Sequence, residues 1–210
     1  MYRAVSVAAA AASALSSHWK KLPVAVLVFT SLAAHAEWQV LKTERGAQLQ
    51  GRSVTGERMN ELRVEVPTKA TPQQLSAYLL GRYLDEPGEG IERKFVSRSP
   101  SHAEWTDQIK APVVSLRCAT TRMDVMSSTS SPVTSIRFES ADRWPLGKPQ
   151  DCVALRTRGA WELVTAASGS TLRYTVFTDL GGSVPAFMVR GALETDALQR
   201  AVRVAQEAAQ

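Results

Sequence analysis

The chain has 210 residues, of which 44% are hydrophobic and 21% charged. This composition is typical of one globular domain and excludes a disordered or fibrous chain. Residues 1–36 hold three of the 25 Lys and Arg residues and none of the 20 Asp and Glu residues. Residues 37–210 therefore have 22 basic and 20 acidic residues, a net charge of only +2. So small a positive charge argues against a nucleic-acid partner. Only one of the three histidines lies in residues 37–210, and the two cysteines form no CxxC pair, so we expect no metal and no cofactor.

Residues 1–36 have the pattern of a secretory signal peptide. The 12 apolar residues Leu22 to Ala33 follow two lysines, and the small residues Ala34 and Ala36 stand at the −3 and −1 positions of a cleavage site. Twelve apolar residues are too few to span a membrane, which takes about 20. We therefore predict cleavage near Ala36, export to the periplasm or the medium, and a mature domain of residues 37–210. The alternative is that the segment stays attached as an N-terminal anchor.

Two strands and a helix are predicted first in the mature chain. Residues 46–54 alternate weakly, and residues 61–67 cleanly, between apolar and polar side chains, as half-buried strands do. A helix follows, because Thr71 can cap its first turn, Pro72 suits the first helical position and Gln74 completes a capping box.

A series of strands is predicted after the polar loop of residues 85–92. Their apolar residues recur at every second position, which is the period of a strand with one buried face. Gly159 is interpreted as a bulge within one of them, and the Ser-rich residues 127–131 and Gly169 as turns. The predicted strands are residues 94–99, 104–109, 117–126, 133–139, 153–163 and 172–178.

A long helix is predicted at the C-terminus. The two glycines before Ser183 end the last strand, Ser183 is the candidate N-cap, Pro185 falls in the first turn, and the helix continues to about residue 208. At 1.5 Å per residue, about 24 residues make a helix about 36 Å long, enough to cross a sheet. With no linker between two cores, the mature chain is predicted to be one α+β domain. One apolar stripe follows helical spacing in Val184, Phe187, Met188, Ala192, Leu198, Ala201, Val202 and Ala205.

Cys118 and Cys152 fit two interpretations. In the oxidising compartment that export implies, they can form a disulfide, which would stabilise the domain by about 3–4 kcal/mol in the chain-entropy model. They can equally be two small buried hydrophobic residues. Their spacing does not decide, because disulfide formation depends on geometry.

Several stretches of the mature chain resemble the START (StAR-related lipid-transfer) family, in particular its small exported bacterial members. Residues 174–187 look like the family's last strand, its Asp-x-Gly-Gly turn and the Val-Pro-Ala-Phe start of its last helix. Residues 159–163 look like the penultimate strand, residues 111–117 like a Pro-x-x-x-x-Arg segment, and residues 37–49 fit the family's opening. The resemblance implies a helix-grip fold, in which an antiparallel sheet curves around the long C-terminal helix and leaves a tunnel for a lipid or sterol-like ligand.

The tunnel that the resemblance implies has predicted lining residues on several strands and on the last helix. One departure from the family pattern is Cys118, which stands where the family has an Asp after Arg117, so Arg117 needs another partner or solvent. The lining has few charges, which predicts an apolar ligand. For any single member, a place in a filled core is the alternative. The predicted lining residues are Trp105, Arg117, Met123, Val125, Trp161, Tyr174, Val176, Phe187, Met188 and Ala192.

The sequence predicts no catalytic residue. The Asp residues are scattered over different elements, and surface solvation accounts for each of them. His102 follows Pro100 and Ser101 in a predicted loop, and it is interpreted as an exposed histidine rather than a base, because no nucleophile of known geometry accompanies it. Ser183 is better explained as a helix cap than as a nucleophile.

We therefore expect an exported domain that binds a lipid or another hydrophobic small molecule in the tunnel, for carriage or sensing, and that is not an enzyme. The resemblance also allows a transient contact with a membrane. The alternative is an enzyme of the aromatase/cyclase kind from the same superfamily, which would fold a polyketide-like substrate in the same cavity and would need converging polar groups there. A third outcome is a domain whose cavity is closed and which contacts only other proteins.

Overall fold

The computed structural model describes residues 36–111, 114–126, 133–167 and 169–210. The predicted signal peptide, except for Ala36, and the Ser-rich turn of residues 127–131 lie outside the described residues. Three helices are found within those ranges, namely α1 (Pro72–Leu80), α2 (Arg82–Asp85) and α3 (Ala186–Glu207). The strands are β1 (Gln39–Glu44), β2 (Ala47–Arg52), β3 (Glu61–Thr68), β4 (Ile91–Arg98), β5 (His102–Ala111), β6 (Val114–Met126), β7 (Val133–Ala141), β8 (Val153–Ala154), β9 (Arg156–Ala166) and β10 (Gly169–Asp179).

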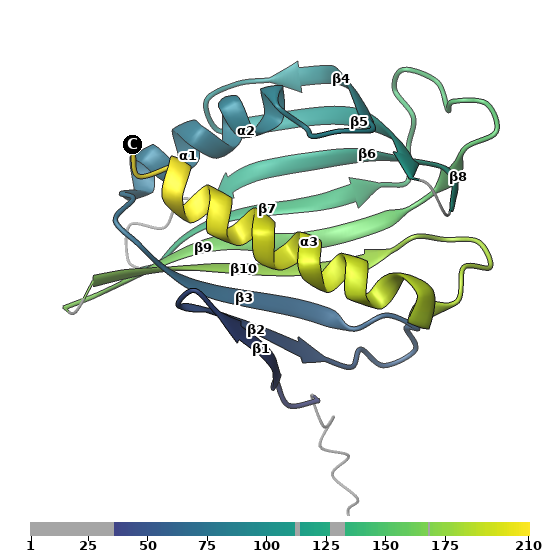
Figure 1. The fold of residues 1–210 in the computed structure, drawn as a ribbon. Coiled ribbons are helices and arrows are strands. Elements are labelled where there is room, and N and C mark those ends of the chain that lie inside the picture. Colours follow the sequence, from purple (N-terminus) through teal and green to yellow (C-terminus); the bar gives the residue numbers. More distant parts are fainter. Residues whose placement is uncertain (1–35, 112–113, 127–132, 168) are drawn as a thin grey trace, which may run out of the picture. The chain divides into compact units, whose positions relative to one another are not determined.

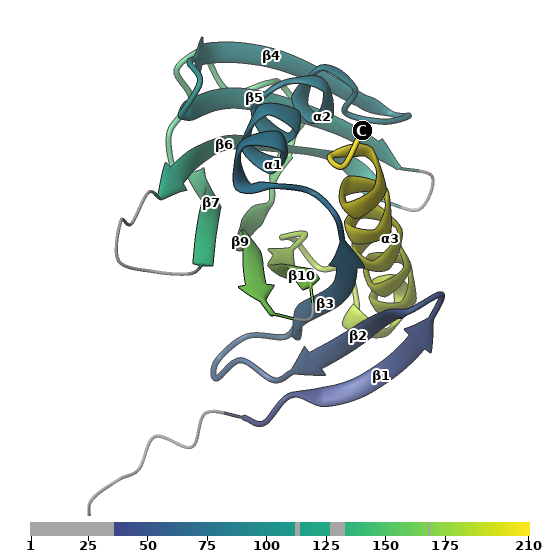
Figure 2. The ribbon, with the colours of Figure 1, turned by 90° about the vertical axis from the view of Figure 1, so that its left-hand side faces the viewer.

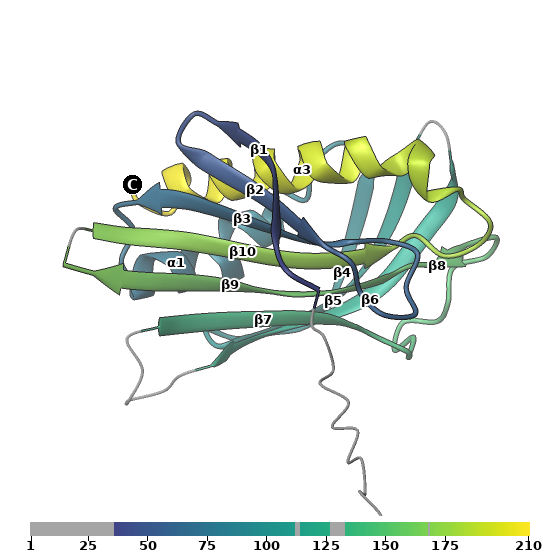
Figure 3. The same ribbon diagram turned by 90° about the horizontal axis from the view of Figure 1, so that it is seen from below.

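All ten of these strands belong to one sheet (Figure 1). Neighbouring strands pair antiparallel in the order β1-β2-β3-β10-β9-β7-β6-β5-β4, and the short β8 pairs parallel to β6. The sheet curves, and the three helices lie on its concave side, with α3 between the two edges of the sheet (Figure 2). Seen from below, α3 extends along most of the length of β10 (Figure 3). The predicted α+β helix-grip arrangement is confirmed.

The start of α1 confirms the capping that its sequence predicts. The Thr71 side chain accepts a hydrogen bond from the Gln74 backbone N–H, and the Gln74 side chain accepts one from the Thr71 backbone N–H. Pro72 stands at the first helical position, where no hydrogen bond from its nitrogen is needed. Leu75 and Leu79 are fully buried on the face of α1 that meets the sheet, and burial of each is worth about 1.5–3 kcal/mol.

The predicted start of α3 is wrong by two residues. The helix begins at Ala186, and its N-cap is Pro185 rather than Ser183. Both Gly181 and Gly182 have positive φ angles, of 66° and 64°, so the chain turns sharply here and Ser183 is left exposed before the helix. Among the described residues, no helix has both the length and the apolar composition that a membrane span requires.

Gly159 is not the bulge that its position in a strand suggests. The pairing of β9 with β10 continues through it without a shift in register. A Cβ atom at this position would collide with the Thr175 carbonyl oxygen and would lie 2.6 Å from Cζ of Phe138. Glycine is therefore needed here for the close approach of the Phe138 ring. The predicted strand 153–163 is also divided at Leu155 into β8 and β9.

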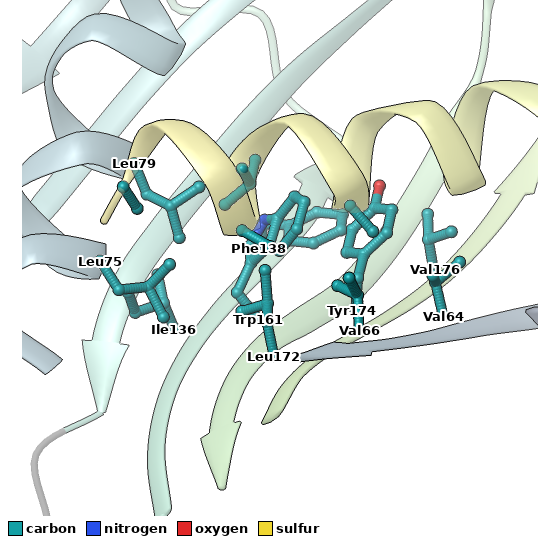
Figure 4. Packing of buried hydrophobic residues seen from close by; sticks show 14 of the residues in the cluster. Val64, Val66, Leu75, Leu79, Ile136, Phe138, Trp161, Leu172, Tyr174 and Val176 are labelled. Carbon is teal, nitrogen blue, oxygen red and sulfur yellow. The ribbon is translucent and has the colours of Figure 1, made fainter. Parts of the chain in front are cut away.

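The core lies between the concave face of the sheet and the second half of α3. It combines alternate residues of β3 and β10, such as Val64 and Leu172, with Ile136 from β7 and Trp161 from β9 (Figure 4). Leu75 and Leu79 of α1 pack against this cluster near Ile136. The alternation predicted for residues 61–67 and 172–178 is confirmed by the residues of β3 and β10 that face this core, namely Leu62, Val64, Val66, Leu172, Tyr174 and Val176. Phe177 is buried in a separate cluster.

Cys118 and Cys152 form a disulfide, which decides between the two interpretations of the sequence. The bridge ties β6 to the segment that contains β8. A Cβ atom at Gly181 would collide with the carbonyl oxygen of Ala154 in β8. The turn that leads into α3 therefore rests against a strand that the disulfide holds in place.

Candidate ligand cavity

A cavity of about 310 Å³ lies between the concave face of the sheet and α3. Its walls come from α2, from strands β3 to β7, β9 and β10, from the loop before β3, and from residues 190–200 in the middle of α3. Ligand pockets in proteins typically span about 300–1,000 Å³, so this cavity is at the small end of the range. At about 30 Å³ for each group the size of a water molecule, it has room for about ten such groups.

Stacked aromatic rings form the apolar floor of the cavity. The rings of Trp161 and Tyr174 stack with their centroids 3.9 Å apart. Phe138 also stacks with Tyr174, with the ring centroids 6.1 Å apart, and Tyr83 meets Trp161 edge-on at 5.9 Å. The Tyr174 hydroxyl points toward α3 (Figure 4). Burial raises the pKa of this phenol, so it stays protonated near neutral pH.

A buried ion pair stands at the β4–β5 side of the cavity. The Nε and Nη2 atoms of Arg93 donate to the two carboxylate oxygens of Asp107, each at 2.7 Å. The Trp105 indole N–H donates to the same carboxylate at 2.9 Å, and the third donor of Arg93 reaches the Leu84 carbonyl at 3.2 Å. Such a bidentate pair is both strong and fixed in orientation, so the hydrogen bonds from Arg93 and Trp105 fully engage the Asp107 side chain.

A further polar cluster comes from α3. Arg200 donates to the Tyr83 hydroxyl at 2.9 Å and to the Asp196 carboxylate at 2.8 Å. The charge interaction with Tyr83 raises the pKa of Arg200 and outweighs the opposing effect of burial. The interaction with Asp196 also raises this pKa. Arg200 is therefore cationic at any pH at which the protein is folded.

These clusters correct the expectation that the cavity lining has few charges. Asp107 was attributed to the surface, but it lies two residues after Trp105 on β5 and therefore shares its face. Arg93 lies directly opposite Asp107 in the register of β4 and β5. The parity of Asp107 with Trp105 was visible in the sequence, whereas its pairing with Arg93 depends on a register that the sequence does not show.

The structure places five of the predicted lining residues on the cavity wall, namely Trp105, Met123, Trp161, Tyr174 and Val176. Val125 lies elsewhere, in a groove beside α1. Arg117 is buried beyond the cavity, where its Nη1 atom donates to the backbone carbonyl and the hydroxyl of Ser115 at 2.7 and 2.6 Å. Ser115 is thus the partner that replaces the missing Asp.

Phe187, Met188 and Ala192 do not line the cavity, so this part of the prediction is wrong. All are exposed, Phe187 by 80% and Met188 by 55%. The buried face of α3 instead follows Val189, Ala197 and the residues after it. Small or apolar residues occur on both sides of the first half of α3, so its sequence is compatible with two rotations of the helix about its axis. Packing against the sheet selects the rotation that buries Val189 and leaves Phe187, Met188 and Ala192 exposed.

Comparison with known proteins finds similarity in structure. No protein-family model matches the chain, and no curated protein has a matching sequence. A STAR-related lipid transfer protein from Xanthomonas axonopodis superimposes with a TM-score of 0.69 at 18% identity, over 82% of this chain and 99% of that one. Human STARD10 has a TM-score of 0.65 at 15% identity, over 82% of this chain and 72% of that one. Human StAR-related lipid transfer protein 5 has a TM-score of 0.64 at 15% identity, over 82% of this chain and 86% of that one. The chain therefore has the helix-grip fold of the START domains.

Proposed function

We propose that residues 37–210 form an exported domain that binds a small amphipathic molecule in the cavity under α3, for carriage or sensing. The observation that carries this proposal is the cavity itself, about 310 Å³ with a floor of stacked aromatic rings. The START-like fold supports it, because the structures it resembles are named as lipid transfer proteins.

The size of the cavity favours a ligand with one short apolar chain. Burial of about ten CH₂ groups would contribute about 8 kcal/mol at 0.8 kcal/mol each, before the cost of immobilising the ligand. A lipid with two long acyl chains exceeds this volume. The ion pairs Arg93–Asp107 and Arg200–Asp196 place hydrogen-bonding groups on the wall with little net charge, which suits a single polar group such as a hydroxyl or a carboxyl group.

We propose binding rather than aromatase/cyclase-like catalysis. An enzyme of that kind needs a titratable group in the cavity that can exchange a proton with the substrate. Asp107 is engaged by Arg93 and Trp105, and burial raises the pKa of Tyr174, so neither group is suited to that role.

Straight-chain fatty acids of 6 to 16 carbons test the proposal. Their affinities are measured by displacement of a fluorescent fatty acid from the purified protein. We expect the affinity to rise about fourfold with each CH₂ group, equivalent to 0.8 kcal/mol, and to level off beyond about ten carbons, when the cavity is full. Absence of displacement at every length would contradict the proposed function.

We propose export on the basis of the sequence pattern of residues 1–36. The disulfide is consistent with an oxidising compartment. N-terminal sequencing of the protein from a periplasmic fraction should show a first residue near Glu37. A protein that begins at Met1 or Tyr2 in that fraction would contradict cleavage.

We also propose a transient contact with a membrane at the start of α3. Phe187 and Met188 are large apolar side chains exposed on its first turn, and an aromatic ring suits the interface of a bilayer. Replacement of both with Ser should reduce sedimentation with phosphatidylcholine vesicles. The matched control is Phe95→Ser on β4, which removes another exposed ring and should leave sedimentation unchanged. Equal sedimentation of all the variants would contradict the contact.

A further inference from the structure

Three polar side chains stand in a row on the face of the sheet opposite the cavity. The His102 Nδ1 atom lies 2.7 Å from Oδ1 of Asp124, and the His102 Nε2 atom lies 3.2 Å from Oγ of Ser97. Both distances are within the reach that a nucleophile, its base and the group that orients the base require. The sequence analysis placed His102 in a loop without a nearby nucleophile, whereas the structure places it at the start of β5 beside Ser97.

The pairing of β4, β5 and β6 builds this row. His102 and Asp124 are directly opposite each other in the β5–β6 register. Between Phe95 and Ser97 a bulge shifts the register of β4, so that Ser97 pairs with Glu104, two residues from His102. Without the bulge Ser97 would pair with Ala103, and its side chain would point to the cavity side of the sheet. The bulge is what brings the Ser97 hydroxyl to the face of His102.

The surroundings of Asp124 fix the proton on the correct nitrogen of His102. Oδ2 of Asp124 accepts from Arg122 Nε at 2.9 Å, which leaves Oδ1 to accept from His102 Nδ1–H. In this tautomer the lone pair of Nε2 faces the Ser97 hydroxyl. The other charged groups that face Asp124 and Arg122 from β7 are Arg137, opposite Asp124, and Glu139, whose carboxylate lies 3.5 Å from Arg122.

We propose that Ser97, His102 and Asp124 form a second site, at which Ser97 is an activated nucleophile toward small acyl esters. The Ser97 Oγ attacks the ester carbonyl carbon while its proton passes to His102 Nε2, and that proton then leaves with the alcohol. Water next attacks the acyl-Ser97 ester, His102 takes a proton from the water, and the same proton returns to Ser97 Oγ as the carboxylic acid is released. The balance is one ester and one water converted to one acid and one alcohol.

The backbone at Ser97 also supplies a donor for the negative oxygen that develops in this reaction. The Ser99 N–H donates to the His102 carbonyl at 2.7 Å, which makes this a hydrogen-bonded pair. Because such pairs alternate along antiparallel strands, Arg98 and Ala103 are a non-hydrogen-bonded pair. β4 is the terminal strand of the sheet, so the Arg98 N–H points away from β5. A donor directly after the nucleophile can stabilise an oxyanion.

The substrate class follows from the openness of the site. Ser97 is exposed, and the side chains of His102 and Asp124 are 32% and 36% exposed. Such a site sets few limits on the alcohol part of an ester, and it gives little binding energy for a long acyl chain. We therefore expect short, activated acyl donors to react. The site is separate from the cavity and does not depend on the proposed binding function.

A fluorophosphonate probe, which modifies activated serines, tests this site on the full purified protein. We expect peptide mass spectrometry to locate the label on Ser97, with a rate that falls at least about 100-fold in Ser97→Ala and His102→Gln. The labelling rate should fall in Asp124→Asn as well, because the amide favours the imidazole tautomer with the proton on Nε2. The matched control is Ser183→Ala, which removes another exposed serine and should leave the rate unchanged.

The pH profile of the wild-type protein gives a readout that does not depend on any variant. Labelling should be faster at alkaline than at acidic pH, because only a neutral imidazole can accept the proton of the serine hydroxyl. 4-Nitrophenyl acetate should release a burst of one nitrophenol per chain. Equal labelling of several surface serines, a flat pH profile, or an unchanged rate in a folded His102→Gln variant would overturn the proposal.

Discussion

The two halves of α3 meet the sheet in different ways. In the second half, Ala201 and Val204 are 0% exposed, and the helix packs against β3. In the first half, Val189 is buried, whereas Met188 and Ala192 are exposed. The C-terminal end of the helix is therefore a fixed part of the core, whereas residues 190–200 form a wall of the cavity.

Hydrogen bonds and residue size account for the difference. Small alanines let the second half of α3 approach the sheet, and the Thr68 hydroxyl donates to the Ala205 carbonyl at 2.7 Å. The Tyr78 hydroxyl of α1 donates to Glu207 at 2.8 Å. In the first half, a Cβ atom at Gly191 would meet open space among the described residues. The first half of α3 therefore has less packing to lose, and it is the part of the helix that would move to admit the proposed ligand.

Removal of the disulfide should have the largest effect on stability. The bridge closes 34 residues and holds β8, on which the turn before α3 rests. The Cys118→Ala, Cys152→Ala double variant should lose about 3–4 kcal/mol of unfolding free energy, measured by urea denaturation. Reduction of the wild-type protein should give the same loss. A loss below about 1 kcal/mol in both experiments would show that this turn does not depend on the bridge.

Truncation of one valine in each half of α3 tests the comparison directly. Val204 is 0% exposed and belongs to the main core, so Val204→Ala should cost about 2–3 kcal/mol. Val189 is 6% exposed in a smaller cluster with Met59 and Phe177, so Val189→Ala should cost about 1 kcal/mol. Urea denaturation of both variants measures the costs. If Val189→Ala proves the more damaging of the two, the first half of α3 is not the loosely held one.

Hydrogen exchange should show the same asymmetry without any substitution. Backbone amides from Leu198 to Val204 should open with a free energy about 2 kcal/mol higher than those from Met188 to Leu193. Addition of a fatty acid that binds should slow exchange mainly in the range from Met188 to Leu193. Uniform protection along α3 would mean that the helix opens as one unit.

Acidification should have the smallest effect, at the turn before α3. A hydrogen bond from Arg156 lowers the pKa of Asp179, against the opposing effect of burial, and the Gly181 N–H also donates to this carboxylate. The stabilisation is therefore complete above the unfolded pKa of about 3.9 and is lost as the pH falls through the lower folded value. Asp179→Asn should cost about 1 kcal/mol at pH 7 and nothing at the lowest pH. Equal costs at both pH values would exclude this ionisation as the cause.

Local sequence patterns predicted the elements of the fold where one rule dominates. Thr71, Pro72 and Gln74 specify the start of α1 by short-range hydrogen bonds, and the alternation of Leu172, Tyr174 and Val176 specifies the face of β10. β1 has no such signal, because its residues are largely exposed, and the sequence did not predict it.

The site was predicted in part, because its residues depend on register and rotation. Trp161 and Tyr174 were found from strand parity, whereas Arg93 joins Asp107 only through the β4–β5 register. Ser97 reaches His102 only because of a bulge, which the sequence does not indicate. The rotation of α3 follows from packing against the sheet, and two rotations fitted its sequence.

Two phenylalanine substitutions on α3 test the central claim, that a ligand binds beneath this helix. Ala197 lies on the cavity wall and Ala192 is exposed on the same helix. Ala197→Phe should fill part of the cavity and weaken fatty-acid binding at least about 30-fold, equivalent to about 2 kcal/mol of lost burial, while Ala192→Phe changes it less than about twofold. Circular dichroism of both variants checks that they are folded. Equal binding by the two variants, at the wild-type level, would contradict a ligand site in this cavity.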